Sequence, residues 1–434
     1  MTPRRSVSAA ATAALVLTIP LATAAPARAA HDPEHGSDVA ILVTWNHAMV
    51  SSLEQAPVTP GPVAGRVSAI VQSSVFDAVN GVTERYTPYF ETPQAPSDTS
   101  AGAAAIGAAH EALTLLFPAQ QATYDALLTQ TVAELPPCDQ GAIDRGLAWG
   151  KKVADDISAW RADDGFTTVP PPYQPTPVPG HWQPTPPLFG PPAFRQFATM
   201  VPFTMTAPDQ FLPPPPPALT SVQYAKDFNE TKAYGSSNST VRSAYGTETA
   251  ILWASDSPTD LWNPVADTLI LRHHLGLSAA ARLLAQLNLA IGDAAIAVYN
   301  AKSYYDTWRP ITAIQQADSD GNPDTTADPS WQPLLNTPSF QEYPSGHSGL
   351  SGAANAVLAA QFGNHTAFQI STPLLPGVVH SFNSFADGIA EVAQARIDAG
   401  FHFRFACDAA AAMGREISAW VTTTQMQPVH DDRR

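Results

Sequence analysis

The amino-acid sequence predicts an all-α protein, a large helical bundle with a long proline-rich surface arm. Apolar residues recur at spacings of three and four along most of the chain, which is the helical period. There is no convincing run of alternating apolar and polar residues, the pattern of a half-buried strand. Between 170 and 217 lie 18 of the 42 prolines, and proline is excluded from helix interiors.

The first 30 residues have the features of a signal peptide. Arg4 and Arg5 precede an apolar run over 9–25, and residues 27–30 supply the small side chains of a cleavage site. The apolar run is too short for a membrane span. We therefore expect an exported protein, secreted or otherwise delivered to a periplasmic or extracellular space.

Helices are predicted at 67–79, 102–116, 119–134, 143–160, 221–235, 240–254 and 278–308. The last begins at Ser278, a suitable N-cap, and its middle is so rich in Ala and Leu that burial on most sides is expected. No stretch after the leader is expected to be long and apolar enough for a transmembrane helix. The predicted organisation is a leader over 1–30, helical regions over 31–168 and 221–434, and a proline-rich arm over 169–220, with 31–434 forming one compact domain.

The proline-rich arm carries several aromatic side chains, which a free linker would seldom do. Tyr173, Trp182, Phe189 and Phe194 favour an arm packed on the helical body. A pocket rim or a partner surface would have the same composition, so these two interpretations stay open.

Net charge excludes some partners. The chain has a formal charge of −16, which becomes −19 without the leader, because the leader contains three arginines and no acid. Such a protein repels nucleic acid and anionic lipid. Cys138 and Cys407 are the two cysteines, and in an oxidising compartment they have the chemistry to pair, but their spacing does not decide this.

The first segment with unusual chemistry covers residues 302–310. Lys302 and Arg309 are seven residues apart, so on one continuous helix both would project from the same face. Such a pair is usually a solvated face. Here the preceding helix is apolar and aromatic residues surround the pair, and two buried cations need an anion.

The second segment is Pro344-Ser345-Gly346-His347, followed by an Ala-rich helical stretch. A helix that begins here has free first amides and a dipole that favours an anion. Ser345 adds a hydroxyl donor, Gly346 allows close backbone approach, and His347 titrates near neutral pH. A plain turn before a helix uses the same residues, so this segment alone does not decide.

The third segment runs from Arg396 to His402. Six residues of separation place these two side chains on different faces of a continuous helix, but Gly400 between them is a suitable helix end. A break there would bring both to one point. Alone, His402 beside two phenylalanines is more typical of a core histidine than of a ligand.

Together the segments supply three fixed cations, two neutral donors and two imidazoles: Lys302, Arg309, Arg396, Ser345, the Gly346 amide, His347 and His402. This set suits a tetrahedral oxyanion that passes through a trigonal-bipyramidal state. Cations and amides would hold the equatorial oxygens, and one imidazole would sit at each apex.

These motifs, K-x6-R-P, P-S-G-H and R-x5-H in this order, resemble the signature of the vanadium haloperoxidase and type 2 phosphatidic acid phosphatase superfamily. The likeness covers about residues 279–413. One position departs from it, because Ala395 stands where the family often has Ser before the third-motif arginine. That loses a peripheral hydroxyl and leaves the charged positions intact.

The resemblance implies vanadate as cofactor, with hydrogen peroxide and halide as substrates and hypohalous acid as product. His402 would be the apical ligand of the metal, with Lys302, Arg309, Ser345, Gly346 and Arg396 around its oxygens. His347 would be the acid–base group and Lys302 would polarise peroxide. Trp308 and Phe340 are similar to residues of the haloperoxidases and would lie at the halide pocket.

Two alternatives remain. If phosphate esters bind instead, the resemblance implies a secreted acid phosphatase in which His402 forms a phosphohistidine and His347 protonates the leaving alcohol. The other alternative is an oxyanion-binding protein without turnover, against which His347 argues, since simple binding needs no second imidazole. Asp306 and Asp398 lie inside the motifs and are candidates to orient Arg309 or an imidazole.

Overall fold

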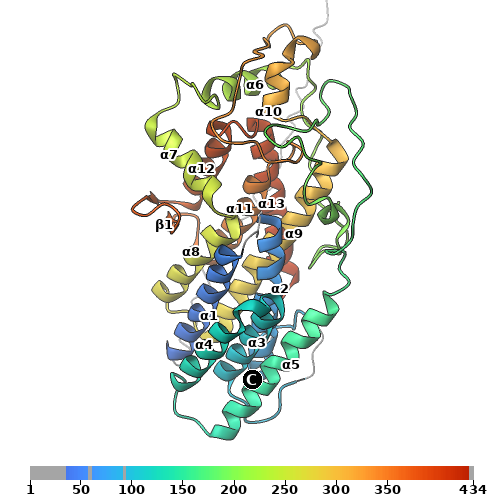
Figure 1. The fold of residues 1–434 in the computed structure, drawn as a ribbon. Coiled ribbons are helices and arrows are strands. Elements are labelled where there is room, and N and C mark those ends of the chain that lie inside the picture. Colours follow the sequence, from blue (N-terminus) through green and yellow to red (C-terminus); the bar gives the residue numbers. More distant parts are fainter. Residues whose placement is uncertain (1–35, 57–60, 91–93, 430–434) are drawn as a thin grey trace, which may run out of the picture. The chain divides into compact units, whose positions relative to one another are not determined.

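The computed structural model describes residues 36–56, 61–90 and 94–429, so the predicted leader lies outside the described part of the chain. These described residues pack as one compact unit. The all-α prediction is confirmed, and the helices are α1 (Gly36–Gln55), α2 (Gly61–Thr83), α3 (Ala101–Leu116), η1 (Pro118–Gln120), α4 (Gln121–Ala133), α5 (Gln140–Trp160), η2 (Arg195–Thr199), α6 (Val222–Tyr234), α7 (Ala244–Ser255), α8 (Pro258–Arg272), α9 (Leu277–Tyr305), α10 (Pro310–Gln315), η3 (Ala317–Ser319), α11 (Gly346–Phe362), α12 (Phe385–Asp398) and α13 (Arg404–Thr424) (Figure 1).

A two-stranded antiparallel sheet is the one element type that the sequence did not predict. β1 (Phe368–Ser371) pairs with β2 (Val379–Phe382), and Phe368 stands opposite Phe382 with ring centroids 4.9 Å apart. Each strand has only four residues, which is too short for its alternation to stand out from the helical pattern.

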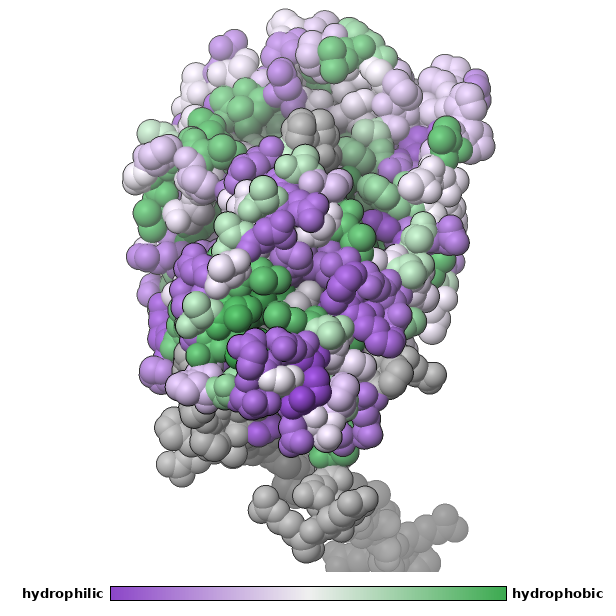
Figure 2. Space-filling view, turned by 60° about the horizontal axis from the view of Figure 1, so that its bottom comes forward, coloured by the Kyte–Doolittle hydropathy of each residue, from purple (hydrophilic) through white to green (hydrophobic). Residues whose placement is uncertain are grey.

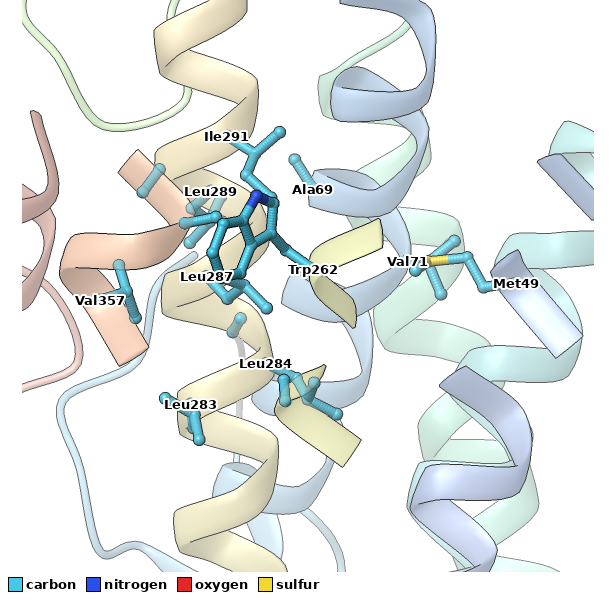
Figure 3. Close-up of a cluster of buried hydrophobic side chains, with 14 of the residues drawn as sticks. Met49, Ala69, Val71, Trp262, Leu283, Leu284, Leu287, Leu289, Ile291 and Val357 are labelled. Atoms are coloured by element: carbon cyan, nitrogen blue, oxygen red, sulfur yellow. The ribbon is translucent and has the colours of Figure 1, made fainter. Parts of the chain in front are cut away.

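Helix α9 forms the centre of the bundle. It packs against α2, α11 and α13, and Trp262 of α8 lies among its leucines together with Ala69 of α2 and Val357 of α11 (Figure 3). Truncating a leucine buried in this way costs about 2–5 kcal/mol. The expectation of no transmembrane-like stretch was wrong, because α9 is long and apolar enough to cross a membrane. Its most apolar window is, however, 94% buried inside the fold.

Helix starts follow the capping chemistry of the sequence. At several N-termini a serine hydroxyl accepts a hydrogen bond from the amide three residues on, as at Ser100, Ser221, Ser243, Ser257 and Ser384. Ser278 was predicted to cap α9, but the helix begins one residue earlier and Gly276 is its N-cap.

The C-terminus of α9 corrects a prediction that matters for the site. The helix ends at Tyr305, because Asp306 adopts a left-handed conformation with φ +48°, and a new helix, α10, begins at Pro310. Lys302 and Arg309 therefore do not share one helical face. They approach each other across a chain reversal instead.

The proline-rich segment 169–220, the green coil beside the helices in Figure 1, is hydrogen-bonded to the helical body. The Trp182 amide donates to the Asp306 carbonyl at 2.8 Å, and the Tyr173 hydroxyl donates to the Asp306 carboxylate. Trp182 is fully buried, whereas Phe189 is exposed. Farther along the segment, the carbonyls of Pro213 and Pro214 accept hydrogen bonds from two tyrosine hydroxyls.

Helices α11 and α13 touch at backbone distance. A Cβ added at Gly414 would lie 2.3 Å from the Gly349 carbonyl oxygen, and one at Gly352 would lie 2.9 Å from the Ala411 backbone. Only glycine permits this approach, so the first half of α11 is held against the middle of α13. The Ser345 amide of the second motif also donates to the Ala406 carbonyl at 3.1 Å, four residues after the end of the third motif.

The surface is mixed in polarity. On the face shown in Figure 2, polar residues surround smaller apolar patches. Cys138 is exposed and Cys407 is buried, and both are free thiols, so the possible pairing does not occur in this structure.

Candidate oxyanion site

The second and third motifs meet at a cavity of about 370 Å³, and the charged residues of the first motif lie beside it. The cavity is lined by residues of α1, α2, α7, α8, α9, α11 and α12 and of the connections between helices. Gly346, His347, Arg396 and His402 all lie on its wall, as does Phe340. The predicted break between Arg396 and His402 is present, since α12 ends at Asp398 and Gly400 has φ +78°.

Lys302 lies in the last turn of α9 and is completely buried. Its Nζ donates hydrogen bonds to the carbonyls of Gln341 at 2.6 Å and Glu342 at 3.0 Å, and lies 5.1 Å from the centroid of the Phe340 ring. Burial and the Arg309 charge lower the pKa of Lys302 well below its usual value. The loop before the second motif therefore fixes the ammonium in place without neutralising it.

Arg309 precedes α10 and is also completely buried. Its guanidinium donates to the carbonyls of Phe340 at 2.6 Å and Phe401 at 2.8 Å, and Nη1 lies 3.2 Å from His402 Nε2. Its Cζ is 4.7 Å from the centroid of the same Phe340 ring that Lys302 contacts. Burial lowers the pKa of Arg309 to about 10. Lys302 and Arg309 thus share the Phe340 ring, and Arg309 contacts His402 of the third motif.

Arg396, in the last turn of α12, completes the set of cations. Nη1 donates to the Trp253 carbonyl at 2.8 Å, and the guanidinium lies 4.8 Å from the centroid of the Phe401 ring. Its Nε is buried and has no hydrogen-bond partner among the described residues. Burial lowers the pKa of Arg396 to about 9.

The start of α11 supplies the neutral donors. Ser345 is the N-cap and fully buried, and its hydroxyl caps no amide and has only the Cys407 thiol as a partner in the described part of the chain. Nothing lies within 4 Å of a Cβ built at Gly346, so the helix start faces open space. First-turn amides and the helix dipole favour an anion at such a place.

His347, one residue further, presents an unpaired ring nitrogen. The ring forms a hydrogen bond with the backbone of Asp256, and Nε2 has no partner within the described ranges. Burial and the charge of Arg396 lower the pKa of His347 well below its usual value. The imidazole is therefore neutral and oriented, with Nε2 free to exchange a proton with a molecule in the cavity.

His402 is held from the side opposite the cavity by Glu342. Nδ1 lies 3.1 Å from Glu342 Oε1, which also accepts the Phe403 amide at 3.0 Å. Burial and the nearby cations, Arg309 first, lower the pKa of His402 well below its usual value. A neutral imidazole that donates from Nδ1 to a carboxylate has its lone pair at Nε2, which is the nitrogen beside Arg309.

Three side chains do not lie where the sequence placed them. Trp308 was predicted at the halide pocket, but it does not line the cavity and packs in an apolar cluster with Tyr224 and Phe403. Asp306 and Asp398 contact neither Arg309 nor an imidazole of the site. Asp306 caps α9 and accepts hydrogen bonds from the arm, and Asp398 accepts one from Gln394.

Glu342 is the site residue that the sequence did not reveal. It stands alone in an irregular segment, and no periodic pattern or motif marks it. Its exposed fraction is 1%, and burial raises its pKa to about 7. The only available signal was its nearness to the second motif, five residues before His347.

Charge balance decides what the site accepts. Within the described ranges none of the three cations forms an ion pair with a carboxylate, although all are buried. Arg396 Nε and His347 Nε2 also lack partners there. Buried cations and donors without partners are costly unless a bound anion compensates them. The residues present therefore fit a tetrahedral oxyanion.

The fold and the site define a class, a helical-bundle protein with a buried cationic pocket for an oxyanion. Comparisons with known proteins agree with it. Residues 282–431 match the family model described as the VCPO second helical-bundle domain. Vanadium chloroperoxidase of Curvularia inaequalis is 25% identical over 400 residues, and the match covers 72% of this chain and 64% of that protein.

Two solved structures share the fold. A bacterial vanadium-dependent iodoperoxidase superposes with a TM-score of 0.77 at 24% identity, covering 89% of this chain and 97% of that one. A bacterial vanadium-dependent chloroperoxidase in its holo form superposes with a TM-score of 0.68 at 19% identity, covering 85% and 94%. These similarities agree with the resemblance of the three motifs to the superfamily of the vanadium haloperoxidases and type 2 phosphatidic acid phosphatases.

Proposed function

We propose that this protein is a vanadate-dependent haloperoxidase, which uses hydrogen peroxide to oxidise halide to hypohalous acid. The observation that carries the proposal is the cluster of three buried, unpaired cations beside the neutral His402, whose Nε2 lies 3.2 Å from Arg309. The relatives named above are vanadium chloroperoxidases and an iodoperoxidase, so the comparisons do not favour the phosphatase alternative.

Each residue of the site has a role in this proposal. His402 Nε2 would be the protein ligand of vanadate, and its oxygens would be held by Lys302, Arg309, Arg396, Ser345 and the Gly346 amide. When bound, vanadate would act as a Lewis acid that activates peroxide without changing oxidation state. Glu342 is a positioning residue, since it fixes the tautomer and the direction of the His402 ring.

His347 would carry the proton. Because its lowered pKa keeps the imidazole unprotonated and its ring is held by the Asp256 backbone, Nε2 has a lone pair available for a proton from hydrogen peroxide. The same nitrogen can return the proton to the leaving oxygen. The Phe340 ring packs against Lys302 and Arg309. In this position it would separate a halide from bulk water.

The experiment measures binding and turnover separately. Purified protein is dialysed with vanadate and analysed for vanadium, with His402→Ala as the variant expected to retain none. Halogenation of monochlorodimedone with chloride or bromide, and oxidation of iodide, then test turnover and rank the halides. Vanadium binding without turnover would leave only the binding-protein alternative. Vanadate-inhibited hydrolysis of p-nitrophenyl phosphate, with no halogenation, would support the phosphatase.

The protein is also proposed to be exported. Support comes from the sequence of residues 1–30, with paired arginines, an apolar run and small residues before the first helix. Expression in a bacterial host and N-terminal sequencing of protein recovered outside the cytoplasm would test this. An intact Met1 on cytoplasmic protein would contradict it.

A further inference from the structure

One wall of the cavity carries carboxylates that the proposed reaction does not use. Glu54 at the end of α1, Asp256 before α8 and Asp260 in the first turn of α8 all line it. Asp256 is directly linked to the oxyanion site, because its backbone forms a hydrogen bond with the His347 ring. The acidic wall is therefore adjacent to the His347 imidazole.

Asp260 is the most informative of the three. It is 7% exposed, and Oδ2 accepts a hydrogen bond from the Ser257 hydroxyl at 2.7 Å. The Asp260 carboxylate also accepts a hydrogen bond from the Ser257 backbone amide, as in a capping box. Asp260 lines the cavity, and its Oδ1 is buried and has no hydrogen-bond partner in the described ranges. A buried carboxylate oxygen without a donor needs a cationic or hydrogen-bonding guest.

The three acids also act on one another. The charge of Asp256 raises the pKa of Glu54 and, with Glu54, that of Asp260, in each case after burial as the larger cause. None of the three forms an ion pair within the described part of the chain, and Arg396 is the only lysine or arginine that lines the cavity. A positive charge at this wall would relieve both the repulsion and the unsatisfied oxygen.

The rest of the cavity is apolar and partly aromatic. Leu53, Phe194, Tyr299, Phe340, Leu350 and Leu374 line it. Phe194, Tyr299 and Phe340 form one group of rings, with centroids 5.6 Å apart for Tyr299 and Phe340. A volume of about 370 Å³ accommodates a small organic molecule. Among the described residues no cluster of His, Cys, Asp or Glu has the arrangement to hold a metal ion, so a metal is not the expected guest.

We propose that this cavity binds an aromatic compound with a protonated amine, the ammonium lying at Glu54, Asp256 and Asp260 and the ring lying against the apolar wall. The binding site is independent of turnover, whereas its use as the halogen acceptor rests on the proposed function. In that step hypohalous acid reacts with the ring. A carbon–halogen bond forms and a ring C–H bond breaks, and the hydroxide released from the hypohalous acid takes up the ring proton as water.

The test uses the vanadate-free protein at pH 8 and isothermal titration calorimetry. The probes are tyramine, the neutral 4-propylphenol of similar size, and the anionic 4-hydroxyphenylacetate. We expect tyramine to bind about tenfold more tightly than 4-propylphenol, and the anion to bind most weakly. Equal affinities of tyramine and 4-propylphenol would overturn the proposal, whatever the haloperoxidase activity of the loaded protein.

Three variants locate the ammonium. Glu54→Gln, Asp256→Asn and Asp260→Asn each remove one charge, and each should reduce the preference for tyramine over 4-propylphenol severalfold. Glu54 is exposed on its helix, so its variant should fold even if the capping box at Asp260 does not tolerate change. Glu416→Gln removes a charge from an exposed position of α13 and is the matched control. A preference unchanged in all three variants would place the amine elsewhere and contradict the inference.

Discussion

Two buried groups of cations in this molecule are built in opposite ways. In the first, Arg66 and Arg161 both donate to Asp164 Oδ2, at 2.8 and 3.0 Å, and Arg161 also bonds to the carbonyls of Val201 and Pro202. In the second, Lys302, Arg309 and Arg396 lie in or beside the cavity with no carboxylate partner among the described residues. The first group contains a carboxylate that both of its guanidiniums contact, whereas the second has none among the described residues and leaves its charge for an anion.

A structural group of buried cations can thus be told from a binding group by whether the chain supplies a carboxylate partner. Burial lowers the pKa of Arg161 and of all three site cations, so depth in the protein does not distinguish the two groups. What differs is the presence of a counter-ion within the chain. This suggests experiments in which stability and ligand affinity respond oppositely at the two places.

The largest effect is expected at the first group, in which Arg66 and Arg161 share Asp164. Asp164→Asn would leave two buried guanidiniums without their shared carboxylate, and breaking a buried ion pair from one side costs about 3–5 kcal/mol. Urea denaturation should show this loss, while vanadate affinity stays unchanged in the folded fraction. Asp163→Asn, at the exposed neighbouring residue, is the control and should change stability little. A stable Asp164→Asn protein would contradict the comparison.

At the second group, Lys302, Arg309 and Arg396, a substitution should lower vanadate affinity and not stability. Lys302→Met removes a buried charge that Arg309 repels, so the vanadate-free protein should be at least as stable as the wild type. Vanadate should bind about a hundredfold more weakly, since a hydrogen bond to a charged group contributes about 1.5–3 kcal/mol. Thermal unfolding with and without vanadate measures both quantities. Lys152→Met removes an exposed lysine paired with Asp156 and should leave the vanadate-induced shift in place.

A smaller effect is expected from the residue behind the ligand. Glu342→Gln keeps an oxygen opposite His402 Nδ1 but removes its charge, so the imidazole becomes a weaker ligand. Loss of such a partner costs about 10- to 100-fold in affinity, and we expect the lower end because the hydrogen bond remains. The 15N chemical shifts of the His402 ring should retain the wild-type tautomer. A tautomer change together with intact affinity would remove Glu342 from its positioning role.

A buried acid of α2 gives a different kind of effect, a dependence of stability on pH. Asp77 accepts the amides of Tyr89 and Phe90, and burial raises its pKa to about 7. Between pH 4 and pH 7 the folded protein therefore retains a proton that the unfolded chain releases. Stability should fall as pH rises through this window, by at most about 1.4 kcal/mol per pH unit from one group.

Asp77→Asn removes that contribution, so its stability should decline less steeply from pH 4 to pH 7 than that of the wild type. Urea midpoints at several pH values measure the slope. Asp209→Asn, at an exposed acid, is expected to follow the wild-type curve. Parallel curves for wild type and Asp77→Asn would show that Asp77 is ionised in the folded state.

The comparison of sequence and structure has a physical pattern. The three motifs were legible because their chemistry is local, with a glycine between Arg396 and His402 and a serine before Gly346. The end of α9 was not, because residues 306–308 have no helix-breaking proline or glycine. There the helix stops at Asp306, whose side chain accepts hydrogen bonds from the distant Tyr173 and Gln341. Glu342 was missed for the same reason, since its partners lie about 60 residues away.

The carbonyls of the proline run give the arm a mechanical consequence. Proline lacks an amide hydrogen, so Pro213 and Pro214 offer acceptors without competing donors, and they accept from Tyr305 and Tyr343, whose ring centroids lie 5.2 Å apart. The two tyrosines lie three residues after Lys302 and two before Ser345. A single protease cut in the arm would thus free the end of α9 and the segment before α11 at once, and loss of vanadate binding by nicking should precede any loss of helix content.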